Sequence, residues 1–306
     1  MLAWSCNNCH HEKSFEKMKK MKTTVSICVV NFNTRALLKR CLRSIISHQS
    51  SVVSHEIIVV DNGSSDGSAK MVEKEFPQVR LIKNKDNKFF TVAYNQAAKK
   101  ARGRYLLILN SDTYFVDQSL KKLVAFMDKH PEIGIAEGLQ IEENGKIIPT
   151  GTLGTSPWID FCQLTVFGRL VKGRRVKKFL LSSWDRRESK EVEVACDAFA
   201  LVRTDLFKKI SGYDENFLLY YTENDLCKRI RQAGFKVFHY AGAKVIHRLQ
   251  ASTDQFSWLE KSKFYQHDLA CYYQKYGPRW AAYILPAVIQ LSDFLIYFKK
   301  FLIFNF

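Results

Sequence analysis

Hydrophobic residues in the N-terminal part of the chain follow two alternating patterns. Largely apolar runs of strand length occur at residues 25–30, 56–60, 79–82 and 105–109. Residues 37–46 instead space their apolar side chains three and one positions apart, which gives one stripe along a helix. Helices are also predicted between the later runs. This β-α-β-α-β-α-β order predicts a mostly parallel sheet with right-handed crossovers.

Polar side chains follow each of these runs. The run at 105–109 lacks polar alternation, as is typical of a strand buried on both faces, and it stops at Asn110, Ser111 and Asp112. Any one such polar end fits an ordinary turn. Similar ends follow the other runs, at Asn31, Asn33, Asp61, Asp66 and Asn84. Because ligands of parallel sheets gather beyond the carboxyl ends of the strands, the repetition predicts a binding site.

Composition and missing motifs narrow the class of ligand. No G-x-G-x-x-G follows the first strand and no P-loop motif occurs, which argues against a dinucleotide dehydrogenase and a P-loop kinase. The chain has 47 Lys and Arg against 30 Asp and Glu, a net charge of +17, which indicates an anionic partner. Most of its eight cysteines stand in apolar or helical contexts and fit buried thiols in a reducing cytosol.

The first 22 residues lie outside the strand and helix pattern. Residues 6–10 spell C-x-x-C-H, the haem-attachment motif. Covalent haem attachment requires export, and no secretory signal precedes the motif. We therefore interpret residues 1–22 as a disordered extension, and the hypothesis of a haem or redox protein rests on this motif alone.

Five motifs together resemble the family 2 glycosyltransferases. Three lie at strand ends, V-V-N-F-N at 29–33, I-V-V-D-N-G-S-S-D-G-S at 58–68 and L-N-S-D-T at 109–113. The others are G-Y-D-E-N-F-L-L-Y-Y-T-E-N-D-L-C at 212–227 and V-I-H at 245–247. They stand in the family's order and are most similar to its rhamnosyltransferase-like branch. The resemblance implies a GT-A fold, which is an α/β, Rossmann-like, mixed and mostly parallel sheet flanked by helices.

The resemblance implies a nucleotide-diphosphate sugar donor and a divalent metal, Mg²⁺ or Mn²⁺. A hard cation held by oxygen ligands neutralises the charge of the leaving diphosphate. Asp112 and His247 match the family's metal-binding positions, whereas Asn110 stands where the family often has Asp. A lone histidine after a strand is more often structural, but its position after the acidic motif favours a ligand. The implied nucleotide-sugar-binding residues are Asn31, Asn33, Asp61, Asn62, Ser64, Asp66, Asn95, Asn110 and Ser111.

The acidic motif supplies the predicted catalytic base. Glu223 aligns with the family's Asp that deprotonates the acceptor hydroxyl, and Asp225 is the alternative. The same residues would also suit a helix start, with Thr222 as N-cap and Asp225 as its capping-box partner. We prefer Glu223 as the base. Phe89 and Asp197 replace glycines common in the family, and we interpret Asp197 as an acceptor contact.

These features predict three segments: a disordered extension at 1–22, a GT-A domain at 23–255, and a helical, membrane-associated segment at 256–306. The GT-A domain divides into a nucleotide-sugar-binding half at 23–115 and an acceptor half at 116–255. The periodicity fades between residues 150 and 193, where aromatic and basic residues predict a mobile acceptor-side loop. A solvated basic loop is the alternative.

The last forty residues form a C-terminal apolar helical tail. Residues 280–298 approach the ~20 residues that span a bilayer. The internal Pro286 and Asp293 and the flanking basic residues favour a helix lying in the membrane interface instead. A helix packed on the domain or in a dimer is the remaining alternative.

The resemblance therefore implies an inverting, metal-dependent glycosyltransferase that moves a sugar to a saccharide or lipid-linked acceptor. The implied sugar is rhamnose, and the implied process is cell-surface polysaccharide biosynthesis. We expect the protein at the cytoplasmic face of the cell membrane, on an anionic membrane surface, with no nucleic-acid partner and with its oligomeric state left open. The alternative is a catalytically silent GT-A-fold protein that binds nucleotides or polyanions.

Overall fold

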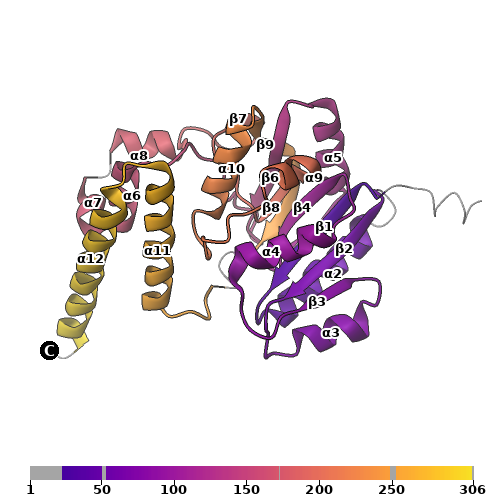
Figure 1. The fold of residues 1–306 in the computed structure, drawn as a ribbon, viewed down its shortest axis with the longest axis horizontal. Coiled ribbons are helices and arrows are strands. Elements are labelled where there is room, and N and C mark those ends of the chain that lie inside the picture. Colours follow the sequence, from indigo (N-terminus) through magenta and orange to yellow (C-terminus); the bar gives the residue numbers. More distant parts are fainter. Residues whose placement is uncertain (1–22, 50–52, 172, 249–252, 305–306) are drawn as a thin grey trace, which may run out of the picture.

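The structure is a computed structural model that describes residues 23–49, 53–171, 173–248 and 253–304, without the side chains of residues 169 and 297–304. The predicted extension and its C-x-x-C-H motif lie outside the described residues. A nine-stranded mixed sheet runs through the described chain in the order β3-β2-β1-β4-β8-β6-β9-β5, with β7 paired to β9 (Figure 1).

The strands are β1 (Val25–Asn31), β2 (His55–Asp61), β3 (Arg80–Lys83), β4 (Tyr105–Asn110), β5 (Thr113–Tyr114), β6 (Ile133–Ile141), β7 (Lys190–Val192), β8 (Phe199–Arg203) and β9 (Lys236–His247). The helices are α2 (Arg35–Gln49), α3 (Ser68–Glu75), α4 (Phe89–Lys100), α5 (Ser119–Lys129), α6 (Pro157–Leu164), α7 (Val166–Leu170), α8 (Arg174–Phe179), α9 (Thr204–Lys209), α10 (Thr222–Gln232), α11 (Trp258–Tyr276) and α12 (Ala281–Phe304).

The four strands predicted from the apolar runs are confirmed, with ends that differ by one residue or less. They form the parallel half of the sheet, β3-β2-β1-β4. Strand β8 then pairs antiparallel with β4 and β6, and β9 runs parallel to β6. The predicted mixed sheet is therefore confirmed. In this register Asn31 lies opposite Asp61, and Val30 lies opposite Asn110.

Apolar side chains fill both faces of the sheet, which explains the largely apolar runs. One core takes Ile27 and Val29 of β1 and Leu107 of β4, and packs them against α2 and α5. The other takes Cys28 of β1 and Ile108 of β4, and packs them against α4 and α10. Successive strand side chains point to opposite faces, so a strand covered on both sides needs apolar residues at every position.

A group of helices lies beside the sheet and contains α6, α7, α8, α11 and α12; we call it the helical lobe (Figure 1). Its core joins the acceptor half to the C-terminal helices through Phe217, Tyr221, Leu269, Tyr273 and Leu285. These contacts join residues on both sides of residue 256. The domain boundary predicted there stays a prediction.

The segment between residues 150 and 193, predicted as a mobile acceptor-side loop, contains three short helices, α6, α7 and α8, so part of it is helical. Each helix has eight residues or fewer, which is too short for a clear helical period in the sequence. The buried Arg186 fixes the segment by donating to the carbonyl oxygens of Thr150, Gly151 and Leu180, among others.

Helix α12 begins at Ala281, contains Pro286 and includes all of the apolar tail predicted at 280–298 except Trp280. Its inward residues Ala281, Leu285 and Ile289 pack in the lobe's core. Among the described residues, no helix combines the length and the apolar character that a membrane crossing requires.

Candidate active site

A buried hydrogen-bond network joins the carboxyl ends of β1, β2 and β4. Asn31 Nδ2 donates to Asp61 Oδ1 (3.0 Å) and to Ser64 Oγ (3.1 Å). Asn31 Oδ1 accepts from Thr34 (2.7 Å), whose hydroxyl also lies 2.9 Å from Ser111 Oγ. Buried polar groups need such partners, and here they satisfy one another. The strand ends that the sequence singled out therefore support one another across the sheet edge.

Two other predicted nucleotide-binding residues shape the loops after β1 and β2. Asn33 has a left-handed backbone (φ 51) and accepts from Ser65 N (2.8 Å). Its amide donates to Gln255 Oε1 (3.1 Å). Asp66 accepts from the backbone N–H groups of Arg35 (2.7 Å) and Ser68. Both side chains therefore fix the backbone turns that follow β1 and β2.

Asn62 orders the segment that precedes α4. Its amide donates to Asn87 Oδ1 (2.7 Å) and to the carbonyl of Phe89 (3.1 Å), and its Oδ1 accepts from Lys88 N. Phe89 has a left-handed backbone (φ 60). A bulky residue in this region costs about 1–3 kcal/mol. The Phe89 ring packs edge-on against Phe264 of α11, 5.4 Å between centroids.

Asn95 holds the acceptor half against α4. Its amide donates to the carbonyl of Tyr213 (2.9 Å) and to Glu215 Oε1 (2.9 Å), and its Oδ1 accepts from Tyr213 N (2.9 Å). The amide N–H groups and the amide oxygen of Asn95 are therefore both engaged in joining α4 to the segment that contains Tyr213 and Glu215. The side chain does not line the cavity described next.

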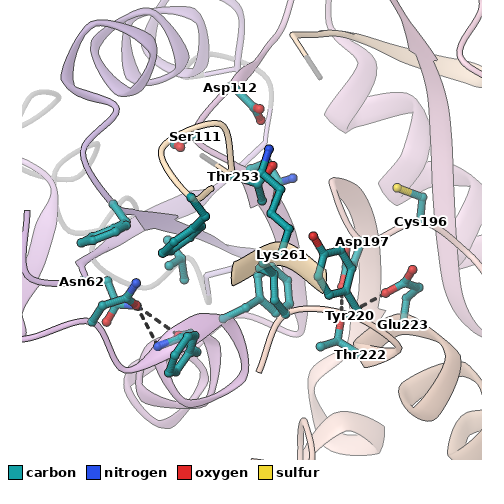
Figure 2. Close-up of a pocket in the computed structure, with 18 of the residues that line it drawn as sticks. Asn62, Ser111, Asp112, Cys196, Asp197, Tyr220, Thr222, Glu223, Thr253 and Lys261 are labelled. Carbon is teal, nitrogen blue, oxygen red and sulfur yellow. Dashed lines mark hydrogen bonds between the residues drawn. The ribbon is translucent and has the colours of Figure 1, made fainter. Parts of the chain in front are cut away.

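A cavity of about 500 Å³ opens at this edge of the sheet (Figure 2). Among the predicted site residues it brings together Asn62, Asn110, Ser111, Asp112, Asp197, Glu223 and His247. The predicted residues that do not line it are Asn31, Asn33, Asp61, Ser64, Asp66, Asn95 and Asp225. The cavity therefore joins the ends of β4 and β9 to the start of α10, which are remote in sequence.

Asp112 and His247 face each other on one wall. Their Oδ1 and Nε2 atoms are 3.3 Å apart, because β5 and β9 pair Thr113 with His247. His247 Nδ1 lies 2.7 Å from the carbonyl oxygen Oε1 of Gln140. Since that oxygen only accepts, Nδ1 carries the proton, and in the neutral ring Nε2 presents its lone pair to the carboxylate.

This pair fits a divalent cation. Asp112 Oδ1 is buried, and no described residue donates a hydrogen bond to it. A carboxylate oxygen and an imidazole nitrogen, the latter oriented by an amide behind it, are an ordinary metal-ligand set. The described ranges contain no group of three or more His, Cys, Asp or Glu side chains arranged around one ion. Mg²⁺ usually keeps several waters and substrate phosphates, so two protein ligands are sufficient.

Two carboxyl groups stand on the opposite wall, with a hydroxyl between them (Figure 2). Thr222 Oγ1 lies 3.0 Å from Glu223 Oε2 and 3.3 Å from Asp197 Oδ2, and Tyr213 donates to Asp197 Oδ2 (3.1 Å). Burial and then the charge of Glu223 raise the pKa of Asp197 to about 8. Burial also raises the pKa of Glu223, with a smaller contribution from the charge of Asp268. At neutral pH the neutral acid is therefore favoured at Asp197.

Asp225 lies on the same helix as Glu223 but serves a different set of contacts. It accepts from Arg229 Nε (2.9 Å), Lys275 Nζ (2.7 Å) and the hydroxyl of Tyr276 (2.7 Å). The predicted capping box is wrong, because Tyr221 (φ 56) is the N-cap residue and no side chain caps this end. Asp225 therefore links α10 to α11, and Glu223 faces the cavity.

Helix α11 also holds the segment that leads into α10. The buried Asp268 accepts from the backbone N–H groups of Leu218 (2.9 Å), Leu219 (2.9 Å) and Tyr220 (2.7 Å). Tyr220 and Lys261, seven residues before Asp268 on α11, both line the cavity. Lys261 and Asp268 were not among the residues predicted from the sequence. Their seven-residue spacing on one helix face was the available signal.

The fold defines the class of protein. It is the GT-A fold, since the structure is similar to the mannosyltransferase PcManGT of Pyrobaculum calidifontis, crystallised with GDP-Man and Mn²⁺. That likeness has a TM-score of 0.57 and 13% identity, and covers 93% of this chain and 77% of that one. It is also similar to GalNAc-T7, crystallised with UDP, GalNAc and Mn²⁺, with a TM-score of 0.56 and 16% identity over 90% of this chain and 55% of that one.

The sequence then gives the family. Residues 26–211 match glycosyl transferase family 2, and the chain belongs to this family of glycosyltransferases. It is 27% identical to the O-antigen biosynthesis protein RfbC of Myxococcus xanthus, over 84% of this chain but only 20% of that protein. It is 23% identical to an N-acetylglucosaminyl-diphospho-decaprenol L-rhamnosyltransferase of Mycobacterium tuberculosis, over 76% of this chain and 78% of that enzyme. The predicted family and GT-A fold are thereby confirmed.

Proposed function

We propose that this chain is an inverting, metal-dependent glycosyltransferase that moves a sugar from a nucleotide-diphosphate donor to a saccharide or lipid-linked acceptor. One observation carries the proposal: the same cavity holds the Asp112–His247 pair on one wall and the Asp197–Glu223 pair on the other. We further propose that the enzyme acts in the biosynthesis of a cell-surface polysaccharide, in agreement with the names of the two bacterial relatives given above.

The donor occupies the strand-end side of the cavity. Asn62, Asn110 and Ser111 offer amide and hydroxyl groups to the nucleotide and the sugar, and the network around Asn31 and Asp61 supports them from behind. Asp112 and His247 would hold Mg²⁺ or Mn²⁺, which as a Lewis acid stabilises the negative charge of the leaving diphosphate.

Glu223 acts as the base for the acceptor. Its carboxylate takes the proton of the acceptor hydroxyl while the acceptor oxygen bonds to the anomeric carbon and the bond from that carbon to the diphosphate oxygen breaks. Attack from the face opposite the leaving group inverts the anomeric centre. The raised pKa of Glu223 brings its basicity closer to neutral pH, as a general base needs. Asp197 keeps its place as an acceptor contact beside the base.

Rhamnose is the proposed sugar, on the strength of the mycobacterial rhamnosyltransferase named above. We place the protein at the cytoplasmic face of the membrane, with the exposed aromatic residues of the helical lobe, among them Trp258 and Trp280, in contact with lipid. Exposed basic residues of α8, such as Arg174 and Lys177, would face anionic headgroups.

A screen of nucleotide-sugars tests the proposal. The protein is incubated with UDP-, GDP- and dTDP-linked sugars, with and without Mg²⁺ or Mn²⁺, and release of the nucleoside diphosphate is measured. We expect release from one nucleotide class, and only with metal. Tight nucleotide binding without release from any donor would instead favour a catalytically silent binding protein.

A further inference from the structure

A second cavity, of about 210 Å³, lies in the helical lobe between α6, α11 and α12. It shares Tyr220 and Lys261 with the active-site cavity, so the two are neighbours across these side chains. The remaining residues that line it are Gln163, Leu164, Trp258, Ser262, Tyr265, Ile289, Asp293 and Ile296. The catalytic steps described above do not use this space.

The walls of the second cavity are amphipathic. Leu164, Ile289, Ile296 and the ring of Trp258 are apolar and come from three helices. Ser262 donates a hydrogen bond to Asp293, and burial raises the pKa of that carboxyl. An apolar cavity of ~150 Å³ is enough for one benzene molecule. This cavity can therefore take a short hydrocarbon segment.

Lys261 places a positive charge at the junction of the two cavities. Its ammonium pairs with Asp254 at 3.3 Å, and that carboxylate is 64% exposed. Exposed ion pairs contribute little free energy, so an anionic ligand can take this partner's place. A phosphate group at Lys261 would lie between the site of Glu223 and the apolar walls of the second cavity.

The outer face of α12 continues the apolar character to the protein surface. Tyr283, Ile284, Leu291, Phe294 and Leu295 are all exposed. From Ile284 to Leu295 this stripe is about 17 Å long at the rise of an α-helix. Scattered apolar residues are normal on a surface, but a stripe along one helix marks a contact with apolar material.

We infer that the second cavity binds the first part of the hydrocarbon chain of a prenyl-diphosphate-linked acceptor, with Lys261 on the diphosphate. The inference rests on the proposed function and selects the lipid-linked acceptor over a free saccharide. The sugar of the acceptor then reaches Glu223 in the first cavity, and the remaining chain leaves along the α12 stripe towards the membrane.

Binding of farnesyl diphosphate and of inorganic diphosphate to the full chain tests this inference. Both are titrated by calorimetry with the donor site saturated by Mn²⁺ and the nucleoside diphosphate that the protein binds. Three variants are compared with the parent: Lys261→Gln, Leu164→Trp, which fills the second cavity, and Leu170→Trp. Leu170 is 86% exposed on α7, lines neither cavity and is the control.

We expect the parent to bind farnesyl diphosphate more tightly than inorganic diphosphate. Lys261→Gln should weaken both by about tenfold, as the loss of a charge-assisted hydrogen bond does. Leu164→Trp should weaken only farnesyl diphosphate, and Leu170→Trp should change neither. Equal affinity of the parent for the two ligands, or no effect of Leu164→Trp, overturns the inference. Failure to bind or hydrolyse any nucleotide-sugar would instead overturn the proposed function.

Discussion

Asp197→Asn should stabilise the protein, and more so at alkaline than at acidic pH. In the folded state burial and the charge of Glu223 raise the pKa of Asp197 to about 8, whereas an unfolded aspartate has a pKa of about 3.9. The folded state therefore binds this proton more tightly. Between these two pKa values the free energy of unfolding falls as pH rises, and above about 8 the loss is complete.

The structure sets the size of the effect. For one group that is protonated in the folded state and ionised in the unfolded state, each pH unit lowers the free energy of unfolding by about 1.4 kcal/mol. Between about pH 5 and about pH 8 the loss is therefore at most ~4 kcal/mol. Asp197 lines the cavity and is only half-buried, so solvent reduces this figure to about 2 kcal/mol. Asparagine keeps an oxygen that can accept from Tyr213 and Thr222, and it has no charge to lose or gain.

Urea unfolding at about pH 5 and about pH 8 measures the effect. The gain in free energy of unfolding from Asp197→Asn should be about 2 kcal/mol larger at the higher pH. Asp205→Asn removes an exposed carboxyl from α9 and controls for the chemical change itself. If the gain from Asp197→Asn is the same at both pH values, Asp197 is ionised in the folded state and the reasoning is refuted.

The remaining predictions concern four carboxylates. Glu223→Gln should lower the transfer rate by about 10²–10⁴ with nucleotide affinity unchanged, in steady-state kinetics and nucleotide titration; a parent-like rate would remove Glu223 as the base. Asp225→Asn should instead lower stability in urea unfolding, because Arg229 and Lys275 lose a buried partner. Asp112→Asn should weaken Mn²⁺ binding, followed by electron paramagnetic resonance with nucleotide present, and unchanged binding would contradict the metal site. Asp268→Asn should cost about 2–3 kcal/mol of stability, since three backbone N–H groups lose an ionised acceptor; an unchanged urea midpoint would show that α11 does not hold this loop.

Local pattern in the sequence determined the parallel half of the sheet. Largely apolar runs without regular alternation indicate strands or helices buried on every side, and their short length and polar ends identify them as strands. Because parallel strands end at one edge, the sequence alone places Asn31, Asp61 and Ser111 together. Their hydrogen-bond network bears out that placement.

Motif order identified the family but not the direction of each side chain. Glu223 and Asp225 are two residues apart on one helix, and the sequence favoured Glu223 as the base with Asp225 as the alternative. Residues two apart on a helix point to different sides, so packing determines which of the two faces the cavity. Contacts with Arg229, Lys275 and Tyr276 hold Asp225 away from the cavity.

Only the tertiary structure brought together groups that are distant in sequence. Asp112 meets His247 through the pairing of β5 with β9, and Asp197 meets Glu223 through a shared hydroxyl. Lys261 reaches both cavities because α11 packs against the acceptor half. Periodicity reports which face of an element is buried, but not which partner covers it. That choice depends on long-range packing, which local sequence does not encode.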